Sequence, residues 1–109
     1  MHTSHEKTQT DHIAQGVSRK ILSHSETLMI VEVRFEAGAI GTDHSHPHEQ
    51  ITYVVSGKAS YHEEGKEAVI MTAGDSYYVT PNAIHGMTAL EKTVVLDVFY
   101  PTREDFLKK

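Results

Sequence analysis

Short runs of apolar and β-branched residues, separated by turn residues, follow one another along most of the chain. The composition of these runs is typical of β-strands, and no helical period is sustained between Val17 and Tyr100. Strands recurring about every 8–12 residues indicate an all-β sandwich or small barrel. The expected strands are Val17–His24, Leu28–Phe35, Gln50–Ser56, Ala59–Glu63, Glu67–Met71, Ser76–Val79, His85–Leu90 and Val94–Phe99.

The segments between these runs carry residues that favour turns. They are Ala37–Gly41, Ser56-Gly57, Glu64–Lys66, Ala73–Asp75, Pro81-Asn82 and Glu91-Lys92. The tail Pro101–Leu107 is the one place that suits a turn of helix, with proline at its start. The polar, histidine-rich residues 1–14 are interpreted as a flexible leader. Residues 15–109 are interpreted as one domain.

Length and composition agree with a single soluble globule. The chain has 109 residues, of which 39% are hydrophobic and 23% charged. Its formal net charge of −5 argues against binding to a phosphate backbone, so no nucleic-acid partner is expected. No apolar run reaches the roughly 18 residues needed to span a membrane, and the first residues lack the apolar core of a signal peptide. We therefore expect a cytoplasmic protein without a membrane partner.

The chain contains nine histidines and no cysteine. The absence of cysteine excludes disulfides, thiol nucleophiles and cysteine-type zinc sites. A bound metal would be held by imidazole and oxygen donors. Such donors suit zinc, iron, nickel or manganese and do not identify the metal.

The densest candidate chemistry lies in the segment that runs from His44 to Gln50. On an extended strand, His44 and His46 point to the same side, and Gln50 shares their parity whereas Glu49 does not. Two such imidazoles before an apolar strand favour a metal site over isolated surface histidines. If Glu49 were the ligand instead of Gln50, the strand would need a bulge. His85 offers a third imidazole; the histidines expected outside the site are His2, His5, His12, His24, His48 and His62.

The last predicted strand contains one acid, Asp97, at its centre. Asp97 shares a strand face with Val95 and Phe99. A buried carboxylate without a partner is costly, so its pKa would rise or it would pair with a cation or metal. The alternative is a carboxylate bonded to backbone amides in the barrel wall. Arg103 follows the strand and is either the salt-bridge partner of Asp97 or a clamp for an anion.

Two separated motifs resemble those of the cupin superfamily. The first reads Gly38, five residues, His44-Ser45-His46, three residues, Gln50, six residues, Gly57. The second is matched by Gly74 and His85. The resemblance implies a conical β-barrel of jelly-roll topology and a divalent metal on His44, His46, Gln50 and His85. Glutamine stands where the superfamily commonly has glutamate, so the ion would keep its full charge and act as a stronger Lewis acid.

The stretch from Leu96 to Leu107 resembles one group of small cupins, the KdgF type of pectin and alginate catabolism. That group commonly ends in Leu-Asp-x-Phe-Ser-Pro-x-Arg-x-Asp-Phe-Leu, and here Tyr100 replaces the serine. The resemblance extends from about Gly16 to Leu107. Its members convert 4,5-unsaturated monouronates into linear 5-keto-4-deoxyuronates by ring opening and tautomerisation.

The resemblance also implies roles for single residues. Asp97 would be the acid/base, Arg103 would hold the substrate carboxylate, and Phe99 would shape the sugar pocket, although core packing explains Phe99 nearly as well. Small cupins commonly pair through their sheets, so a homodimer is expected. The alternative functions are a non-catalytic sugar-binding cupin and a small metal-dependent cupin dioxygenase.

Overall fold

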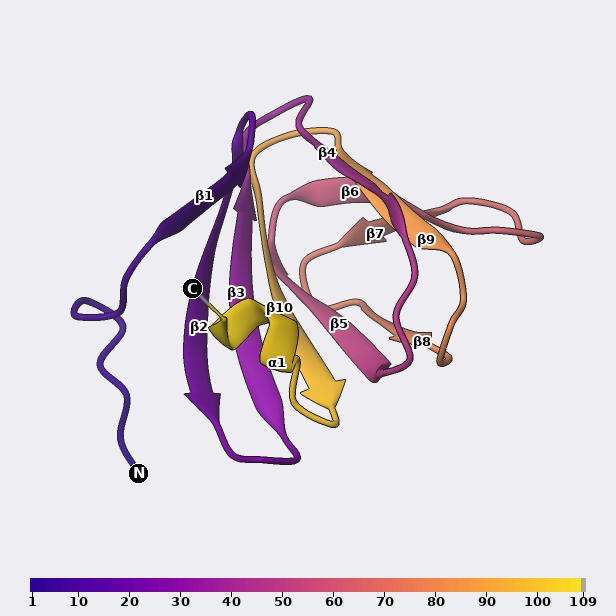
Figure 1. The fold of residues 1–109 in the computed structure, drawn as a ribbon. Coiled ribbons are helices and arrows are strands. Elements are labelled where there is room, and N and C mark those ends of the chain that lie inside the picture. The colour runs from indigo at the N-terminus through magenta and orange to yellow at the C-terminus, as the bar shows by residue number, and fades with distance from the viewer. Residues whose placement is uncertain (109) are drawn as a thin grey trace.

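The protein, described for residues 1–108 by a computed structural model, is built from two antiparallel sheets that face each other (Figure 1). The larger sheet has the order β1-β2-β3-β10-β5-β8. Its strands are β1 (Asp11–Ala14), β2 (Val17–His24), β3 (Met29–Phe35), β10 (Thr93–Tyr100), β5 (Glu49–Ser56) and β8 (Ser76–Val79). The predicted all-β class is confirmed.

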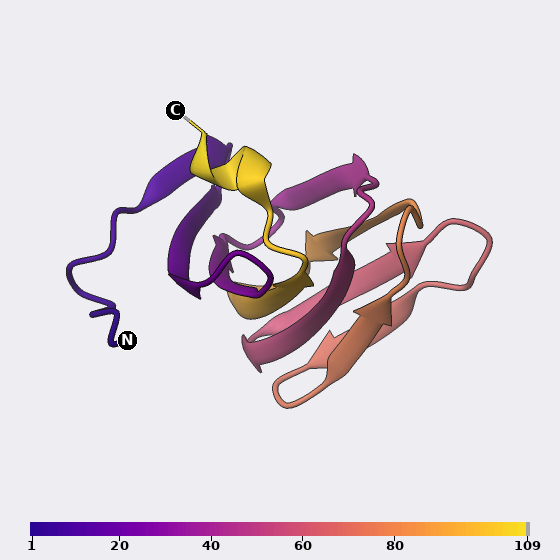
Figure 2. The ribbon, with the colours of Figure 1, turned by 60° about the horizontal axis from the view of Figure 1, so that its bottom comes forward.

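The smaller sheet has the order β4-β9-β6-β7. Its strands are β4 (Ile40–His44), β9 (His85–Ala89), β6 (Lys58–Glu63) and β7 (Val69–Thr72). The chain ends in one helical turn, α1 (Glu104–Leu107), drawn in yellow in Figure 2, and the Phe106 ring of this turn packs against Arg19 of β2. Within residues 1–108, no helix is long and apolar enough to cross a membrane.

Strict alternation along β5 decides which side chains enter the barrel. Gln50, Thr52 and Val54 are buried on the inner face, whereas Ile51 and Tyr53 are exposed on the outer face. The inner faces of both sheets meet in one apolar core. Its most deeply buried members include Met29, Val31, Val54, Val79 and Val95.

The eight predicted strands are all present, with ends that differ by up to two residues. Two further strands, β1 and β4, were not predicted. The β4 sequence Ile-Gly-Thr-Asp-His has four exposed positions out of five and carries turn-type residues, so it lacks the apolar alternation that marks the other strands. The predicted helical turn begins at Glu104 rather than at Pro101, which lies three residues earlier.

Candidate functional site

Three histidines from separate segments converge, of which His46 and His85 are buried and His44 is exposed. His44 ends β4, His46 lies in the following loop and His85 begins β9. Their potential ligand atoms all lie within 4.8 Å of one another, a grouping that could hold a metal ion. The convergence does not come from one continuous strand, as the parity argument assumed, because β4 stops at His44. Instead, His44 and His85 are paired across β4 and β9, and the loop returns His46 to them.

Each of these imidazoles is anchored by its Nδ1 atom. His44 and His85 bond through Nδ1 to the carbonyls of Thr42 and Ala83, both at 2.8 Å, and His46 bonds to the carbonyl of His48 at 3.1 Å. A carbonyl oxygen only accepts, so Nδ1 carries the proton and a neutral ring keeps its lone pair on Nε2. This arrangement is the usual one for metal-binding histidines, in which the second nitrogen fixes the orientation of the ring.

The surroundings of the His85 Nε2 atom indicate whether the cluster fits a metal. This atom is buried and has no hydrogen-bond partner among residues 1–108. A buried polar atom without a partner costs free energy, so such atoms are rare in stable folds. Burial also lowers the pKa of His85, which keeps its lone pair available. A cation bound at Nε2 would satisfy this atom, so the residue fits the metal that the sequence motif implies.

Gln50 faces the histidines with its oxygen. Its Nε2 donates to Thr52 Oγ1 at 2.9 Å and to Asp97 Oδ1 at 3.3 Å, which leaves Oε1 at 2.8 Å from Nε2 of His46. With His46 protonated on Nδ1, two acceptor atoms face each other here. Burial, and next the charge of Arg103, lower the pKa of His46 to about 4, so an imidazolium does not explain the contact at neutral pH. A cation bound between Gln50 Oε1 and His46 Nε2 would explain the short distance.

The alternative ligand, Glu49, points away from this cluster. It is exposed on the outer face of β5, where its Oε1 accepts a hydrogen bond of 2.7 Å from Tyr78. β5 runs from Glu49 through Gln50 without a bulge at these residues, so the expected parity of Gln50 is what the structure has. His48, expected to be a spectator, contributes only its carbonyl to the cluster.

Asp97 lies on the inner face of β10 together with Val95 and Phe99. Its Oδ1 accepts a 2.7 Å hydrogen bond from Thr52 Oγ1 in addition to the bond from Gln50. Side chains, rather than the backbone amides of the alternative interpretation, therefore hold the carboxylate. Burial raises the pKa of Asp97 to about 6, and the hydrogen bond from Thr52 acts against this shift.

Arg103 is buried, with 8% of its surface exposed, directly after β10. Its Nε and Nη2 donate to the two carboxylate oxygens of Asp105 at 3.1 and 2.9 Å. Of the two alternatives for Arg103, the salt bridge to Asp97 is therefore wrong, since the salt-bridge partner is Asp105. The pair with Asp105 uses one edge of the guanidinium, and the Nη1 hydrogens point elsewhere.

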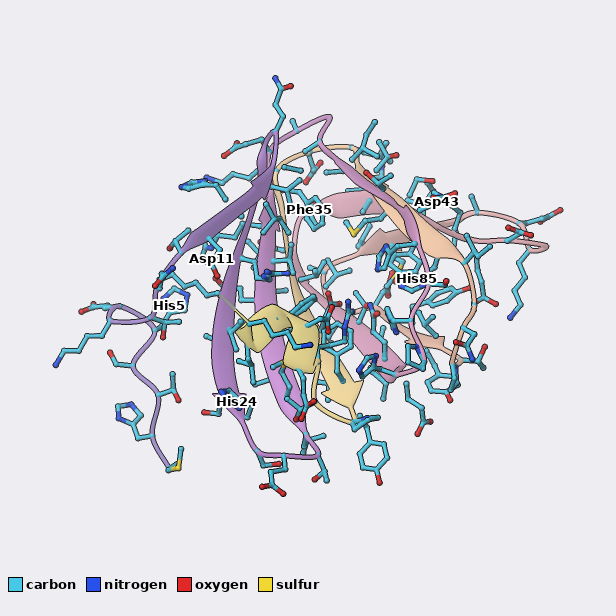
Figure 3. The ribbon with its side chains drawn as sticks, viewed as in Figure 1. His5, Asp11, His24, Phe35, Asp43 and His85 are labelled. Carbon is cyan, nitrogen blue, oxygen red and sulfur yellow. The ribbon has the colours of Figure 1, made fainter. Side chains whose placement is uncertain are left out.

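One cavity of about 290 Å³ connects these groups. Its lining includes His44, Gln50, His85, Asp97, Phe99 and Arg103. Figure 3 shows His85 on the side of the barrel that β4 and β9 form. Phe99 both packs and lines the site: it is 3% exposed, and its ring centre lies 5.6 Å from that of His46. The volume is at the lower end for small-molecule sites.

Some members of the site were not singled out from the sequence. Thr52 and Tyr61 contact Gln50 from β5 and β6, and Arg19 enters the cavity from β2. The parity of Thr52 with Gln50 was a usable signal. Of the histidines placed outside the site, His2, His5, His12 and His24 are exposed, and His62 is half-buried in a pair with Asp43.

Comparisons with known proteins agree with this geometry. A sequence model of the family described as "Cupin domain" matches residues 31–99. The "Pectin degradation protein KdgF" of Dickeya dadantii (strain 3937) is 41% identical over 104 residues, 94% of each chain.

Two solved structures are similar over nearly their whole length. KdgF from Halomonas sp. has a TM-score of 0.92 and 36% identity, with 97% of this chain and 99% of that chain covered. An RmlC-like cupin from Shewanella frigidimarina NCIMB 400 has a TM-score of 0.89 with the same identity and coverage. The chain therefore belongs to the cupin family, within which it groups with the KdgF proteins.

Proposed function

We propose that this protein converts 4,5-unsaturated monouronates from pectin and alginate breakdown into linear 5-keto-4-deoxyuronates. The observation that carries the proposal is one cavity lined by an enclosed carboxylate, Asp97, by a buried guanidinium, Arg103, and by two members of the three-histidine cluster. The name of the relative from Dickeya dadantii, a pectin degradation protein, supports the same substrate class.

The chemistry requires one proton to leave and one to arrive. In the unsaturated monouronate, the ring oxygen joins C1 to the double-bonded carbon C5. Opening the ring breaks the bond from C1 to this oxygen, and the C1 hydroxyl loses its proton to give an aldehyde. The oxygen stays on C5 as an enolate, and protonation of C4 yields the ketone beside the carboxylate. The product is an isomer of the substrate.

The residues that would hold a divalent metal are His44, His46, Gln50 and His85. Zinc, iron, nickel or manganese would suit these donors and would supply an electrophile for substrate oxygens when bound. All four donors are neutral, because Gln50 presents an amide oxygen where a carboxylate would reduce the charge of the site. A site with this charge favours an anionic sugar.

Asp97 would serve as the acid/base. It lies in the cavity beside Gln50, and Thr52 fixes its Oδ1, so the other carboxylate oxygen can take the hydroxyl proton and return a proton to carbon. Phe99 would form the apolar wall between this carboxylate and His46. The wall excludes water from one side of the ring-opened enolate.

Arg103 would bind the substrate carboxylate through the hydrogens that Asp105 leaves free. Replacing Arg103 with alanine is expected to raise KM about 10–100-fold, the value of a charge-assisted hydrogen bond, with a smaller change in kcat. Arg103→Lys should restore binding only in part, because lysine offers a point charge rather than a planar fork. Steady-state kinetics on an unsaturated monouronate measure both constants. An unchanged KM in Arg103→Ala would remove this role.

Thr52 positions two groups at once, because its Oγ1 accepts from Gln50 and donates to Asp97. Thr52→Val keeps the shape but removes this link, so the Gln50 amide loses its orientation. We expect metal affinity to fall about 10–100-fold, as for other partners of metal ligands. Thr52→Ser should retain wild-type affinity, and Thr88→Val, on β9, is the matched control. Competition with a metal-binding dye measures the affinity, and equal values for Thr52→Val and wild type would refute the prediction.

The test of the proposed function is an ultraviolet assay. The conjugated double bond of a purified unsaturated monouronate absorbs, and its decay is followed with and without the protein. Oxygen consumption with flavonols or β-diketones would instead identify a dioxygenase. Binding of the uronate without decay would identify a non-catalytic sugar-binding cupin.

The homodimer stays a prediction; the outer face of β5 and β8 exposes Ile51, Tyr53, Val55 and Tyr78, each between 45% and 48%. Sedimentation equilibrium would measure the oligomeric state. The cytoplasmic location and the boundary between residues 14 and 15 also stay predictions. In the structure, the first segment contacts the larger sheet, where His5 bonds to Glu32.

A further inference from the structure

Arg19 is a charged residue on an apolar inner strand face. It lies between Val17 and Ile21 on β2 and is paired with Val33 of β3, whose side chain is buried in the core. Its side chain lines the cavity that contains Asp97 and Arg103. It takes no part in the ring opening proposed above.

The Arg19 guanidinium lacks a full set of partners. Its Nε is buried and has no hydrogen-bond partner among residues 1–108. Burial is the main cause that lowers the pKa of Arg19, and the nearby charge of Arg103 adds to it, whereas the carboxylates of Asp11 and Asp105 oppose it. Arg19 is half-buried as a whole, and a cation with a buried, unpaired N–H is costly unless an anion joins it.

Neighbouring groups hold Arg19 in place without satisfying its donors. Its Cζ lies 3.9 Å from the ring centre of Phe106, and Cζ of Arg103 lies 4.1 Å from the same ring. Stacking on an aromatic ring fixes the plane of a guanidinium but leaves its N–H groups free. The two nearby carboxylates have other partners. Asp105 accepts hydrogen bonds from Arg103. Asp11, on β1 (Figure 3), accepts a hydrogen bond from Gln9.

We propose that Arg19 is a second anion-binding residue of the cavity, which with Arg103 makes the site selective for sugar acids over neutral sugars. The inference rests on the proposed function for the choice of a uronate as ligand. Two cations around one aromatic side chain repel each other, and a bound carboxylate relieves this repulsion. A neutral sugar offers no such gain.

The test compares two probes that differ only at C6, D-galacturonate with a carboxylate and D-galactose with a hydroxymethyl group. Isothermal titration calorimetry measures their affinities for the wild-type protein, for Arg19→Met and for Arg34→Met. Arg34 is the matched control, because it lies on the neighbouring strand β3 with its side chain 45% exposed. We expect Arg19→Met to lose about tenfold in galacturonate affinity, the value of a charge-assisted hydrogen bond. Galactose binding, and both affinities of Arg34→Met, should stay at the wild-type level.

Arg19→Gln is the second variant if Arg19→Met does not fold, with the same expected result. Equal galacturonate affinity in wild type and in a folded Arg19 variant overturns the inference, as does a wild-type protein that does not prefer galacturonate to galactose. Turnover is not part of this measurement. A protein that fails the ultraviolet assay but loses galacturonate affinity with Arg19 therefore refutes the proposed function and supports the anion-binding role.

Discussion

Replacing Asp97 with asparagine is expected to reduce turnover of unsaturated monouronate by about 100- to 10,000-fold, the usual contribution of a positioned acid/base. The substitution keeps the volume of the side chain, and the amide oxygen can still accept from Thr52 Oγ1, as Oδ1 of Asp97 does at 2.7 Å. Asparagine cannot exchange a proton with the substrate. Fold and metal content should therefore remain while the reaction stops.

Steady-state kinetics and metal analysis of the same preparation separate these effects. Glu36→Gln, which neutralises an exposed carboxylate after β3, is the control for a simple change of charge and should leave turnover unchanged. Near-normal activity in Asp97→Asn would remove Asp97 from the mechanism. Loss of metal together with activity would instead assign Asp97 to the support of Gln50, with which it shares a hydrogen bond.

The sequence predicted the barrel well because most of its strands are half-buried. In β6, the buried Ala59 and Tyr61 alternate with the more exposed Lys58, Ser60 and His62, and this alternation is visible in the sequence. In β5, Gln50 faces inward and Glu49 outward as expected, although a loop separates this strand from His44 and apolar residues of β5 lie on the outer face. β4 escaped prediction because its pairing with β9, rather than its own side chains, makes it a strand. Tertiary pairing overrides weak local preference in such segments.

The members of the site were easier to predict than their partners. His44, His46 and His85 carry a recognisable spacing, but the bond between Arg103 and Asp105 depends on where α1 begins. Arg19 looked like one of several polar residues on β2. Its pairing with Val33 shows that it faces inward. Sequence spacing identifies groups along one segment, whereas contacts between distant strands require the register of the sheets.

Removal of the metal from the histidine cluster is expected to abolish activity. Chelation of the wild-type protein should stop turnover, and added divalent metal should restore it. His85→Ala should lose more than about 100-fold in metal affinity, because it removes a ligand rather than a ligand's partner. The matched control is His62→Ala, which removes a half-buried imidazole from β6 outside the cluster.

Thermal denaturation gives a readout that does not depend on activity. A metal that binds only the folded state adds about 2.7 kcal/mol when its free concentration is a hundred times Kd, or about 10 °C in Tm for a domain of this size. The Tm of the wild-type protein and of His62→Ala should therefore fall on chelation, whereas that of His85→Ala should not respond. Normal turnover by a metal-free wild-type preparation would exclude the electrophilic role of the metal. An equal response of all three proteins to chelation would place the metal away from His85 Nε2, the buried atom on which the fit of this site depends.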